Sequence, residues 1–294
     1  MQNKVTAKDV AKQAGVSVAT VSYVLNGRTD QKISAETKKK ILQIANLLNY
    51  VPSHAAKSLA TGRNNAIGIA YSLSDSPTKN AGLSHFANLL TERLMRLHYD
   101  VVMVPAKRVE DGVHETCNVD AIIAIDLDQN DFRGLADSYL VPVICVDMVV
   151  GDPLFFQIYE DIPYLIEKAF MELKKDEKYY FIYDSFENTN YEDYILSLPD
   201  NVFPLRKRDL TPSVMEKLSE TSIIVLGVYL GLSLLTFLDK NKTCIILSED
   251  EQSLVNGRCH TIINNENKKA NLTINIVTNA LSKHFDIKHD NPIR

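Results

Sequence analysis

The sequence has neither a long hydrophobic run nor an apolar segment near its N-terminus. Its longest apolar stretch, residues 223–238, contains Gly, Ser, Tyr and Thr, which favours a buried strand and helix over a membrane span. A signal peptide would need a continuous apolar segment among the first residues, and the sequence has none there. We therefore expect a cytoplasmic protein with no membrane partner.

The motifs of common enzymes and cofactor-binding proteins are also absent. The sequence contains no G-x-S-x-G motif, no G-x-G-x-x-G after a strand and no glycine-rich phosphate loop. Its four cysteines show no C-x-x-C spacing, and Cys145 and Cys244 lie in apolar runs typical of buried, reduced thiols. The seven histidines lack the H-E-x-x-H spacing of a metal site, and we interpret His85 and His98 as residues near the ends of a helix. These absences predict that the protein is not an enzyme and has no cofactor or metal site.

Charge is unevenly distributed along a chain that is long enough for a small module and a larger globular body. Residues 1–63 contain ten Lys and Arg against three Asp and Glu, a net charge of +7. The remainder contains 22 basic against 34 acidic residues, a net charge of −12. A basic segment on an acidic body indicates that any contact with nucleic acid is made by residues 1–63.

Within the basic segment, capping residues define two short helices. Thr6, answered by Asp9 three residues later, predicts a helix that starts directly after the threonine, and Gly15 can take the left-handed conformation that ends it. Ser17 then caps a second helix over residues 18–25. Two short helices joined at a glycine turn are typical of a helix-turn-helix, whose second helix enters the major groove of DNA. The outward residues of this second helix are Val18, Ala19, Ser22 and Tyr23, and its inward residues are Val21, Val24 and Leu25.

A third helix and a marginal fourth segment follow. Ser34 caps a helix over residues 35–48, for which helical spacing predicts a buried stripe of Ile41, Leu42, Ile44, Ala45 and Leu48. The alternative for such a three-helix unit is a small bundle that contacts other proteins. The segment 53–60 contains small side chains at Ser53, Ala55, Ala56 and Ala60 around one protruding leucine, Leu59, and it is too short to fold stably alone. Such a segment suits a helix that becomes ordered on meeting a partner.

Two motifs in this region resemble the lac/gal repressor (LacI/GalR) family of bacterial transcription factors. They are A-G-V-S-x-x-T-V-S at residues 14–22 and N-Y-x-P-x-x-x-A-x-x-L at residues 49–59. The resemblance implies that the second helix reads the major groove and that paired hinge helices from two subunits open the minor groove. It therefore implies a homodimer on a pseudo-palindromic, double-stranded DNA operator, acting as a transcriptional regulator and most simply as a repressor. Because no heptad repeat follows residue 286, we expect a dimer and not a tetramer.

The resemblance also assigns roles to individual residues. The base-edge readers are Val18, Ala19 and Tyr23. The phosphate contacts are Thr6, Ser17, Thr20, Ser22, Asn26, Lys57 and Arg63. In the hinge, Leu59 matches the leucine wedge that kinks the duplex, and Ala56 lets the two hinge helices approach. Some family members have Arg at the position of Tyr23, so here contacts with thymine methyl groups are favoured over a forked pair with guanine.

Beyond residue 65 the pattern changes to alternating strands and helices. Continuous apolar strands at residues 67–71, 119–125, 141–146, 179–183, 222–226 and 243–247 alternate with helices that include residues 85–98, 162–174 and 230–238. This alternation indicates doubly wound parallel sheets. The resemblance implies a fold like that of periplasmic sugar-binding proteins, with two α/β lobes around a ligand cleft. The predicted division is a helix-turn-helix domain at 1–49, a hinge at 50–64, a first lobe at 65–157 and 264–287, and a second lobe at 158–263.

A small-molecule effector would bind at the carboxyl ends of the strands, where the lobes face each other. The candidate contacts are Tyr71, Ser72, Asp75, Asp147, Tyr194, Tyr229 and Glu249. Sugar-binding relatives usually carry Arg at the position of Tyr194, Asn-Asp at residues 227–228 and Asp-Asp at residues 249–250. This chain has Tyr, Gly-Val and Glu-Asp there, which disfavours a typical sugar pocket.

Two other interpretations of the body remain open. The cleft can be degenerate, so that the body senses a protein partner or nothing, or the body can be an enzyme fused to a DNA-binding segment. Thermal-shift screening distinguishes a small-molecule sensor from the first alternative, because a ligand at about 100 times its dissociation constant adds roughly 2.7 kcal/mol of stability. A turnover screen with candidate metabolites tests the second.

Overall fold

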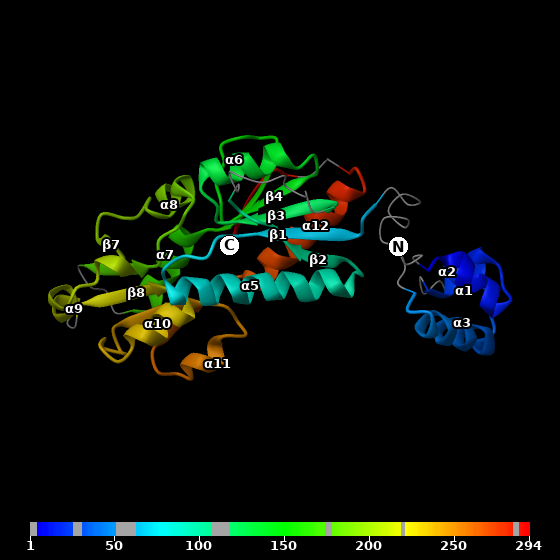
Figure 1. Cartoon of the computed structure of the whole chain (residues 1–294). Helices are drawn as coiled ribbons and strands as arrows, with labels where there is room; N and C mark the ends of the chain where they lie inside the picture. The colour runs from blue at the N-terminus through cyan, green and yellow to red at the C-terminus, as the bar shows by residue number, and fades with distance from the viewer. Residues whose placement is uncertain are drawn as a thin grey trace. The chain divides into compact units, whose positions relative to one another are not determined.

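The computed structural model divides the chain into two compact units, Met1–Asn64 and Asn65–Arg294, which we call the head and the body (Figure 1). The structure describes residues 5–25, 31–50, 63–107, 118–173, 178–218, 221–284 and 288–294. Of the predicted hinge at residues 50–64, residues 51–62 therefore lie outside the described residues. The head and the body are considered separately below.

The head contains three helices whose ends are set by the predicted capping residues. They are α1 (Ala7–Ala14), α2 (Val18–Leu25) and α3 (Ala35–Leu47). At the start of α1, the Thr6 backbone N–H and hydroxyl donate to Asp9 Oδ2 at 2.8 and 2.7 Å. Gly15 ends α1 in the left-handed region at φ 70°, where a Cβ would strain the backbone. The Thr20 and Thr37 backbone N–H groups donate to the hydroxyls of Ser17 and Ser34 at 3.1 Å each, which confirms both as N-caps.

One small core holds these helices together. Its fully buried members are Val10, Ala11, Ala14, Val21, Ile41 and Ala45. Val24, Leu25, Ile44 and Leu48 pack against this cluster while remaining partly accessible. The prediction for Leu42 was wrong: its side chain is 48% exposed. Since α3 packs only on α1 and α2 in the described part of the head, its buried stripe is narrower than helical spacing alone suggests.

The body contains two parallel sheets, which confirms the predicted class of doubly wound α/β lobes. The first sheet has the strand order β11-β5-β4-β3-β1-β2. Its strands are β1 (Ala66–Ala70), β2 (Asp100–Met103), β3 (Ala121–Ile125), β4 (Val143–Val146), β5 (Phe156–Glu160) and β11 (Asp290–Ile293). On one face, α5 (Pro77–Arg96) and α12 (Glu266–Leu281) pack together, and α6 (Gln129–Ser138) covers the other face. Buried strand residues alternate between the two clusters, as a sheet covered on both faces requires.

The second sheet has the order β10-β9-β8-β6-β7. Its strands are β6 (Tyr179–Tyr183), β7 (Val202–Arg206), β8 (Ser222–Leu226), β9 (Thr243–Leu247) and β10 (His260–Ile263). Helices α7 (Ile162–Glu172) and α8 (Thr189–Ile195) pack on one face, and α9 (Pro212–Leu218) and α10 (Val228–Leu234) pack on the other. The short elements η1 (Lys207–Asp209) and α11 (Gln252–Val255) complete the lobe. Figure 1 shows the two sheets at opposite ends of the elongated body.

Two features of the body correct the sequence predictions. The first lobe extends to Glu160, beyond the predicted boundary at residue 157, because β5 pairs with β4 and β11 in the first sheet. Helix α5 begins at Pro77, before the predicted helix at residues 85–98 and inside residues 72–80, which precede that helix and carry a loop-like pattern. Proline is well placed in the first turn of a helix, where its missing N–H costs no hydrogen bond. Among the described residues, no helix is both long and apolar enough to cross a membrane.

Candidate functional site

The outer face of α2 is the candidate DNA-reading surface of the head. Ala19 and Ser22 are exposed, Val18 is 42% exposed, and Tyr23 is half-buried. Their inward counterpart Val21 is fully buried against α1 and α3, so the core fixes which side of α2 faces outward. A short helix that presents a rigid face of small and apolar groups can enter the major groove and touch base edges.

The predicted phosphate contacts fall into three groups. Ser17 and Thr20 are linked by a 2.8 Å hydroxyl–hydroxyl hydrogen bond at the N-terminus of α2, a place that favours anions. Thr6 donates both its hydroxyl and its backbone N–H to Asp9, so a phosphate would have to replace that carboxylate. Ser22 and Arg63 are exposed. Asn26, Ala56, Lys57 and Leu59 lie outside the described residues.

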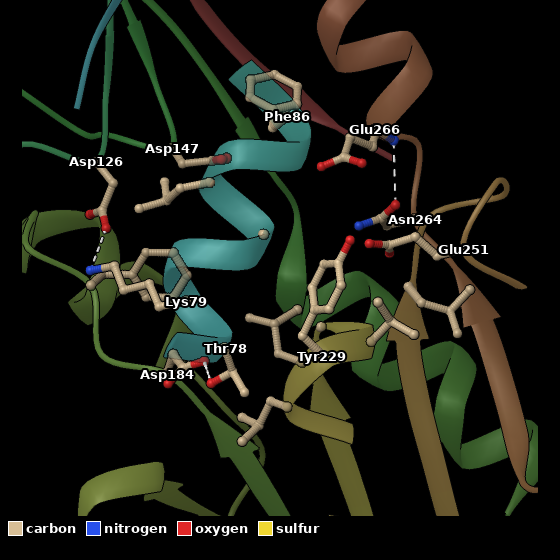
Figure 2. A pocket seen from close by; sticks show the side chains of 18 of the residues that line it. Thr78, Lys79, Phe86, Asp126, Asp147, Asp184, Tyr229, Glu251, Asn264 and Glu266 are labelled. Atoms are coloured by element: carbon tan, nitrogen blue, oxygen red, sulfur yellow. Dashed lines mark hydrogen bonds and ion pairs between the residues drawn. The ribbon is translucent and has the colours of Figure 1, made fainter. Parts of the chain in front are cut away.

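A pocket of about 170 Å³ lies between the two lobes of the body (Figure 2). Its wall combines α5 and the ends of β3 and β4 from the first lobe with α10 and the loops after β6 and β9 from the second. Ligand pockets commonly measure about 300–1,000 Å³, so this one suits a compact molecule. Figure 2 shows the Tyr229 ring in the pocket, with its hydroxyl directed toward Asn264 and Glu251.

The pocket wall is strongly acidic. Five carboxylates line it, and among the lining residues Lys79 is the only Lys or Arg; the carboxylates belong to Asp126, Asp147, Asp184, Glu251 and Glu266. Lys79 Nζ lies 2.8 Å from Asp126 Oδ2 and 3.2 Å from Glu187 Oε1. Burial raises the pKa of Asp126 to about 6, although Lys79 opposes this. Such a wall favours ligands that offer hydrogen-bond donors or positive charge.

Hydrogen bonds across the pocket tie the two lobes together. Asp126 Oδ1 on the first lobe accepts from the backbone N–H groups of Glu187 and Asn188 on the second, at 2.9 and 3.1 Å. At the N-terminus of α5, the hydroxyls of Ser76 and Thr78 donate to the carboxylate of Asp184 at 2.6 and 2.8 Å. A ligand that changes these contacts would change the relative stability of the lobe arrangements.

Known proteins resemble this chain most clearly in the head. The family model described as "Bacterial regulatory proteins, lacI family" matches residues 6–53. The HTH-type transcriptional repressor PurR of Pasteurella multocida is 46% identical over 188 residues, covering 57% of this chain and 53% of that protein. The fructose operon regulatory protein of Vibrio cholerae is 26% identical over 161 residues, covering 51% of this chain and 48% of that protein. The chain thus spans about half the length of the curated relatives it matches.

The fold agrees over the whole chain. A crystal structure of the lac repressor dimer bound to operator and the anti-inducer ONPF has a TM-score of 0.68 and 18% sequence identity, covering 99% of this chain and 96% of that chain. At this identity the likeness shows the fold, with a helix-turn-helix head and a two-lobed body. The head therefore resembles the lacI family over residues 6–53, and the fold of the chain is that of the lac repressor.

Three of the predicted effector contacts lie at the pocket or beside it. Asp147 and Tyr229 line the pocket. Asp75 lies in an adjoining hollow, together with Ser74, Asp184, Glu187 and Lys207. Asp147 is not free to bind a ligand with both oxygens, because its Oδ2 lies 2.8 Å from Lys269 Nζ.

The other predicted contacts lie elsewhere among the described residues. Tyr71 packs against the first-lobe core, and Ser72 follows it outside the pocket lining. The Tyr194 ring contacts the Tyr159 ring edge to face near the end of β5, and its hydroxyl donates to Asp161 at 3.0 Å. Glu249 is exposed, whereas Glu251, two residues later, is buried and lines the pocket.

Sequence reasoning missed most of the charged residues of the pocket. Asp126 follows the apolar strand β3 as Asp147 follows β4, and both adopt positive φ, at 45° and 50°. The rule that ligands bind beyond the carboxyl ends of parallel strands could have selected Asp126. Lys79 carries no such signal, because it lies in a segment predicted as a loop and meets Asp126 only through the fold.

A second buried charge cluster lies beside the pocket around Lys269. Its Nζ is 2.8 Å from Asp147 Oδ2 and 3.8 Å from Glu160 Oε1. Both carboxylate oxygens of Glu160 are buried and accept no hydrogen bond from the described residues. Burial therefore raises the pKa of Glu160 from its ordinary value of 4.5 to about 7, although Lys269 opposes the shift.

This raised pKa predicts an unusual pH dependence of stability. Between pH 4.5 and about 7 the folded chain binds more protons at Glu160 than the unfolded chain does, so the stability of the body falls as pH rises through this window. We expect Glu160→Gln to stabilise the body near pH 8, by an amount on the order of 3 kcal/mol at most. The variant should also make the free energy of unfolding depend less on pH between 4.5 and about 7. Urea unfolding at several pH values measures both effects. The control is Glu167→Gln on α7, whose side chain is exposed; an identical pH profile for the two variants would contradict the prediction.

Proposed function

We propose that this chain is a DNA-binding transcriptional repressor that acts as a homodimer on a pseudo-palindromic operator. The observation that carries the proposal is the exposed face of α2, held outward by a buried Val21 in a head with a net charge of +7 over residues 1–63. The match of residues 6–53 to the lacI-family model supports the same role. The relatives described above are named as regulators or repressors, and the related lac repressor structure is a dimer bound to its operator. A DNA-binding regulator of this kind works in the cytoplasm.

In this proposal, α2 supplies specificity and the charged surface of the head supplies affinity. Val18, Ala19 and Tyr23 contact base edges in the major groove, while hydroxyls at the N-terminus of α2 and basic side chains hold the phosphates. Two heads lie on half-sites about one helical turn apart. The predicted wedge, Leu59, separates a central base step, and Ala56 allows the hinges to pair.

We expect Tyr23→Ala to weaken binding to the operator, as identified by selection from random duplexes, by about 1–3 kcal/mol. This is the usual value of a good base contact. Binding to unrelated duplex DNA should change little, because that binding depends on phosphates. Fluorescence anisotropy with both duplexes at a fixed salt concentration measures the two affinities. The matched control is Lys268→Ala, an exposed substitution in the body. An equal loss on both duplexes would show that Tyr23 does not read bases.

The body supplies the regulation, and the pocket between its lobes is the site where a compact effector binds. Its acidic wall with Tyr229 and Phe86 supports a small ligand that carries hydroxyl or amino groups. Whichever lobe arrangement the effector prefers would set the fraction of DNA-competent dimers. Thermal-shift screening of the full chain with sugars, amines and nucleobases tests this, and stabilisation that Tyr229→Ala abolishes would place the ligand in the pocket.

A body that responds to a protein partner is the second candidate function. The small volume of the pocket and the hydrogen bonds that already close the lobes favour it over a large ligand. If no small molecule stabilises the chain while operator binding is intact, this candidate replaces the effector proposal. We assign no enzymatic activity to the body.

A further inference from the structure

Three residues that are far apart in the sequence meet beside the pocket. His85 lies on α5 of the first lobe, Asp250 lies in the turn after β9 of the second, and Glu266 is the first residue of α12, which returns to the first lobe. One potential ligand atom from each lies within 4.8 Å of the other two. His85 Nε2 is 3.1 Å from Asp250 Oδ2 and 3.7 Å from Glu266 Oε2.

The three side chains differ in how far they are buried. His85 Nε2 has almost no exposed surface and lies close to carboxylate oxygens of both Asp250 and Glu266. The Glu266 side chain is mostly buried, whereas about half of the Asp250 side chain is exposed. Three atoms with lone pairs therefore converge at the edge of the pocket, as the ligands of a shared cation do.

The separations also fit a metal ion. Zinc lies about 2.0–2.2 Å from His nitrogen and carboxylate oxygen, so two tetrahedral ligands are about 3.3–3.6 Å apart. The two measured separations, 3.1 and 3.7 Å, lie on either side of that range. Asp250 is already oriented, because the Ser248 hydroxyl donates to its other oxygen, Oδ1, at 2.7 Å. Hydrogen bonds of this kind commonly orient metal-binding carboxylates.

The local charge is unbalanced toward the negative. Glu251 and Glu266 line the same pocket, in which Lys79 is the only Lys or Arg among the lining residues. The Lys269 ammonium lies nearest to Asp147 and Glu160, and those two acids share its charge. A divalent cation between His85, Asp250 and Glu266 would offset the repulsion among the acids.

We propose that His85, Asp250 and Glu266 bind one divalent transition-metal ion such as Zn²⁺. Three protein ligands leave one position for water or for a polar group of a ligand. Glu266 also lines the pocket, so the ion lies next to the space proposed for the effector. Because the ligands come from both lobes, a bound ion stabilises the lobe arrangement in which they meet.

The ion itself is tested on the full chain, freed of metal with a chelator and titrated with Zn²⁺ in a calorimeter, with Co²⁺ as a second, spectroscopic probe. We expect one Zn²⁺ ion per chain to bind tightly, and any further ions to bind more weakly. Asp250→Asn and Glu266→Gln should each weaken this binding at least about 10-fold, since even substitutions beyond the direct ligands cost 10–100-fold. Glu249→Gln, next to Asp250 and exposed like it but outside the cluster, is the matched control and should bind as the parent chain does.

Melting temperatures of the metal-free variants verify that they fold. Equal affinities for Asp250→Asn, Glu266→Gln and Glu249→Gln would overturn the proposal, as would the lack of a tight ion in the parent chain. His85→Asn gives a second route to the same result, with the visible Co²⁺ absorption expected to be lost.

The regulatory consequence rests on the proposed function and is measured separately, as operator affinity with and without Zn²⁺. Zn²⁺ should change this affinity in the parent chain and in Glu249→Gln, but not in Asp250→Asn. Operator binding without a tight ion would reject the metal site and leave the proposed function standing. A tight ion on a chain that binds no operator would support the metal site and reject the proposed function. A tight ion with no effect on operator affinity would reject only the coupling.

Discussion

Replacing Lys269 with alanine should destabilise the body by about 3–5 kcal/mol, the usual cost of removing one partner from a buried ion pair. The Lys269 side chain is only 6% exposed and lies 2.8 Å from Asp147, with its ammonium 4.6 Å above the Phe86 ring. Without the ammonium, Asp147 becomes an uncompensated charge in the interior, and so does Glu160 at any pH high enough to ionise it. Urea unfolding of the full chain, monitored through the tyrosines of the body, measures the loss.

The neighbouring Lys268 provides the control. It is exposed, and its Nζ donates only a long, 3.4 Å bond to the Arg294 carbonyl, so Lys268→Ala should change stability by no more than about 0.5 kcal/mol. Adding Glu160→Gln to Lys269→Ala should restore part of the loss, because one of the uncompensated acids is then neutral. A Lys269→Ala variant as stable as Lys268→Ala would show that the cluster does not depend on the ion pair.

Replacing Ile41 with alanine should unfold most of the head while leaving the body folded. Ile41 is fully buried in a core of six small residues, and an Ile→Ala change in a core costs about 2–5 kcal/mol. Small domains have little stability in reserve. Operator affinity should therefore fall by a large factor, and the heads should become sensitive to protease while the melting temperature of the body is unchanged.

The next residue of the same helix is the matched control for this variant. Leu42 is 48% exposed, so Leu42→Ala removes as much side chain without opening a cavity and should cost little. If Leu42→Ala impaired the head as much as Ile41→Ala, the core of the head would be different from the one described. Limited proteolysis and operator binding of both variants give the comparison.

The head could be predicted almost completely from the sequence because its signals are local. Thr6, Gly15 and Ser34 act within one turn of the residues they cap, and these helix ends were all confirmed. Leu42 was misplaced because helical spacing gives the direction of a side chain but not the width of the surface that covers it. That width depends on how α1 and α2 pack on α3.

The body was predictable only where its strands are apolar. Strands β3, β4, β6, β8 and β9 were found from such runs, whereas β5, β7, β10, β11 and α12 were not. Strand β5 reads Phe-Gln-Ile-Tyr-Glu and buries both Gln157 and Glu160, while α12 buries Lys269. These polar residues are tolerated inside because Val150 N–H donates to Gln157 and because Lys269 has acidic neighbours, and neither contact leaves a local pattern.

The residues of the ligand pocket were likewise predicted only where they follow an apolar strand. Asp147 and Tyr229 were selected as residues that follow strands, and both line the pocket. Glu251 and Glu266 enter the pocket from α11's start and from the N-terminus of α12, elements that the sequence pattern did not reveal. Histidine spacing along the chain likewise gave no hint of the cluster of His85, Asp250 and Glu266, since its members lie on three separate elements.

The central claim is that the head recognises a specific, two-fold symmetric DNA sequence. Selection from a pool of random duplexes by the full chain tests this claim most directly. We expect enrichment of two inverted half-sites with centres about one helical turn apart, bound with an affinity that falls steeply as salt increases. A pool that stays random after repeated selection, or that enriches one unrepeated sequence, would contradict the account.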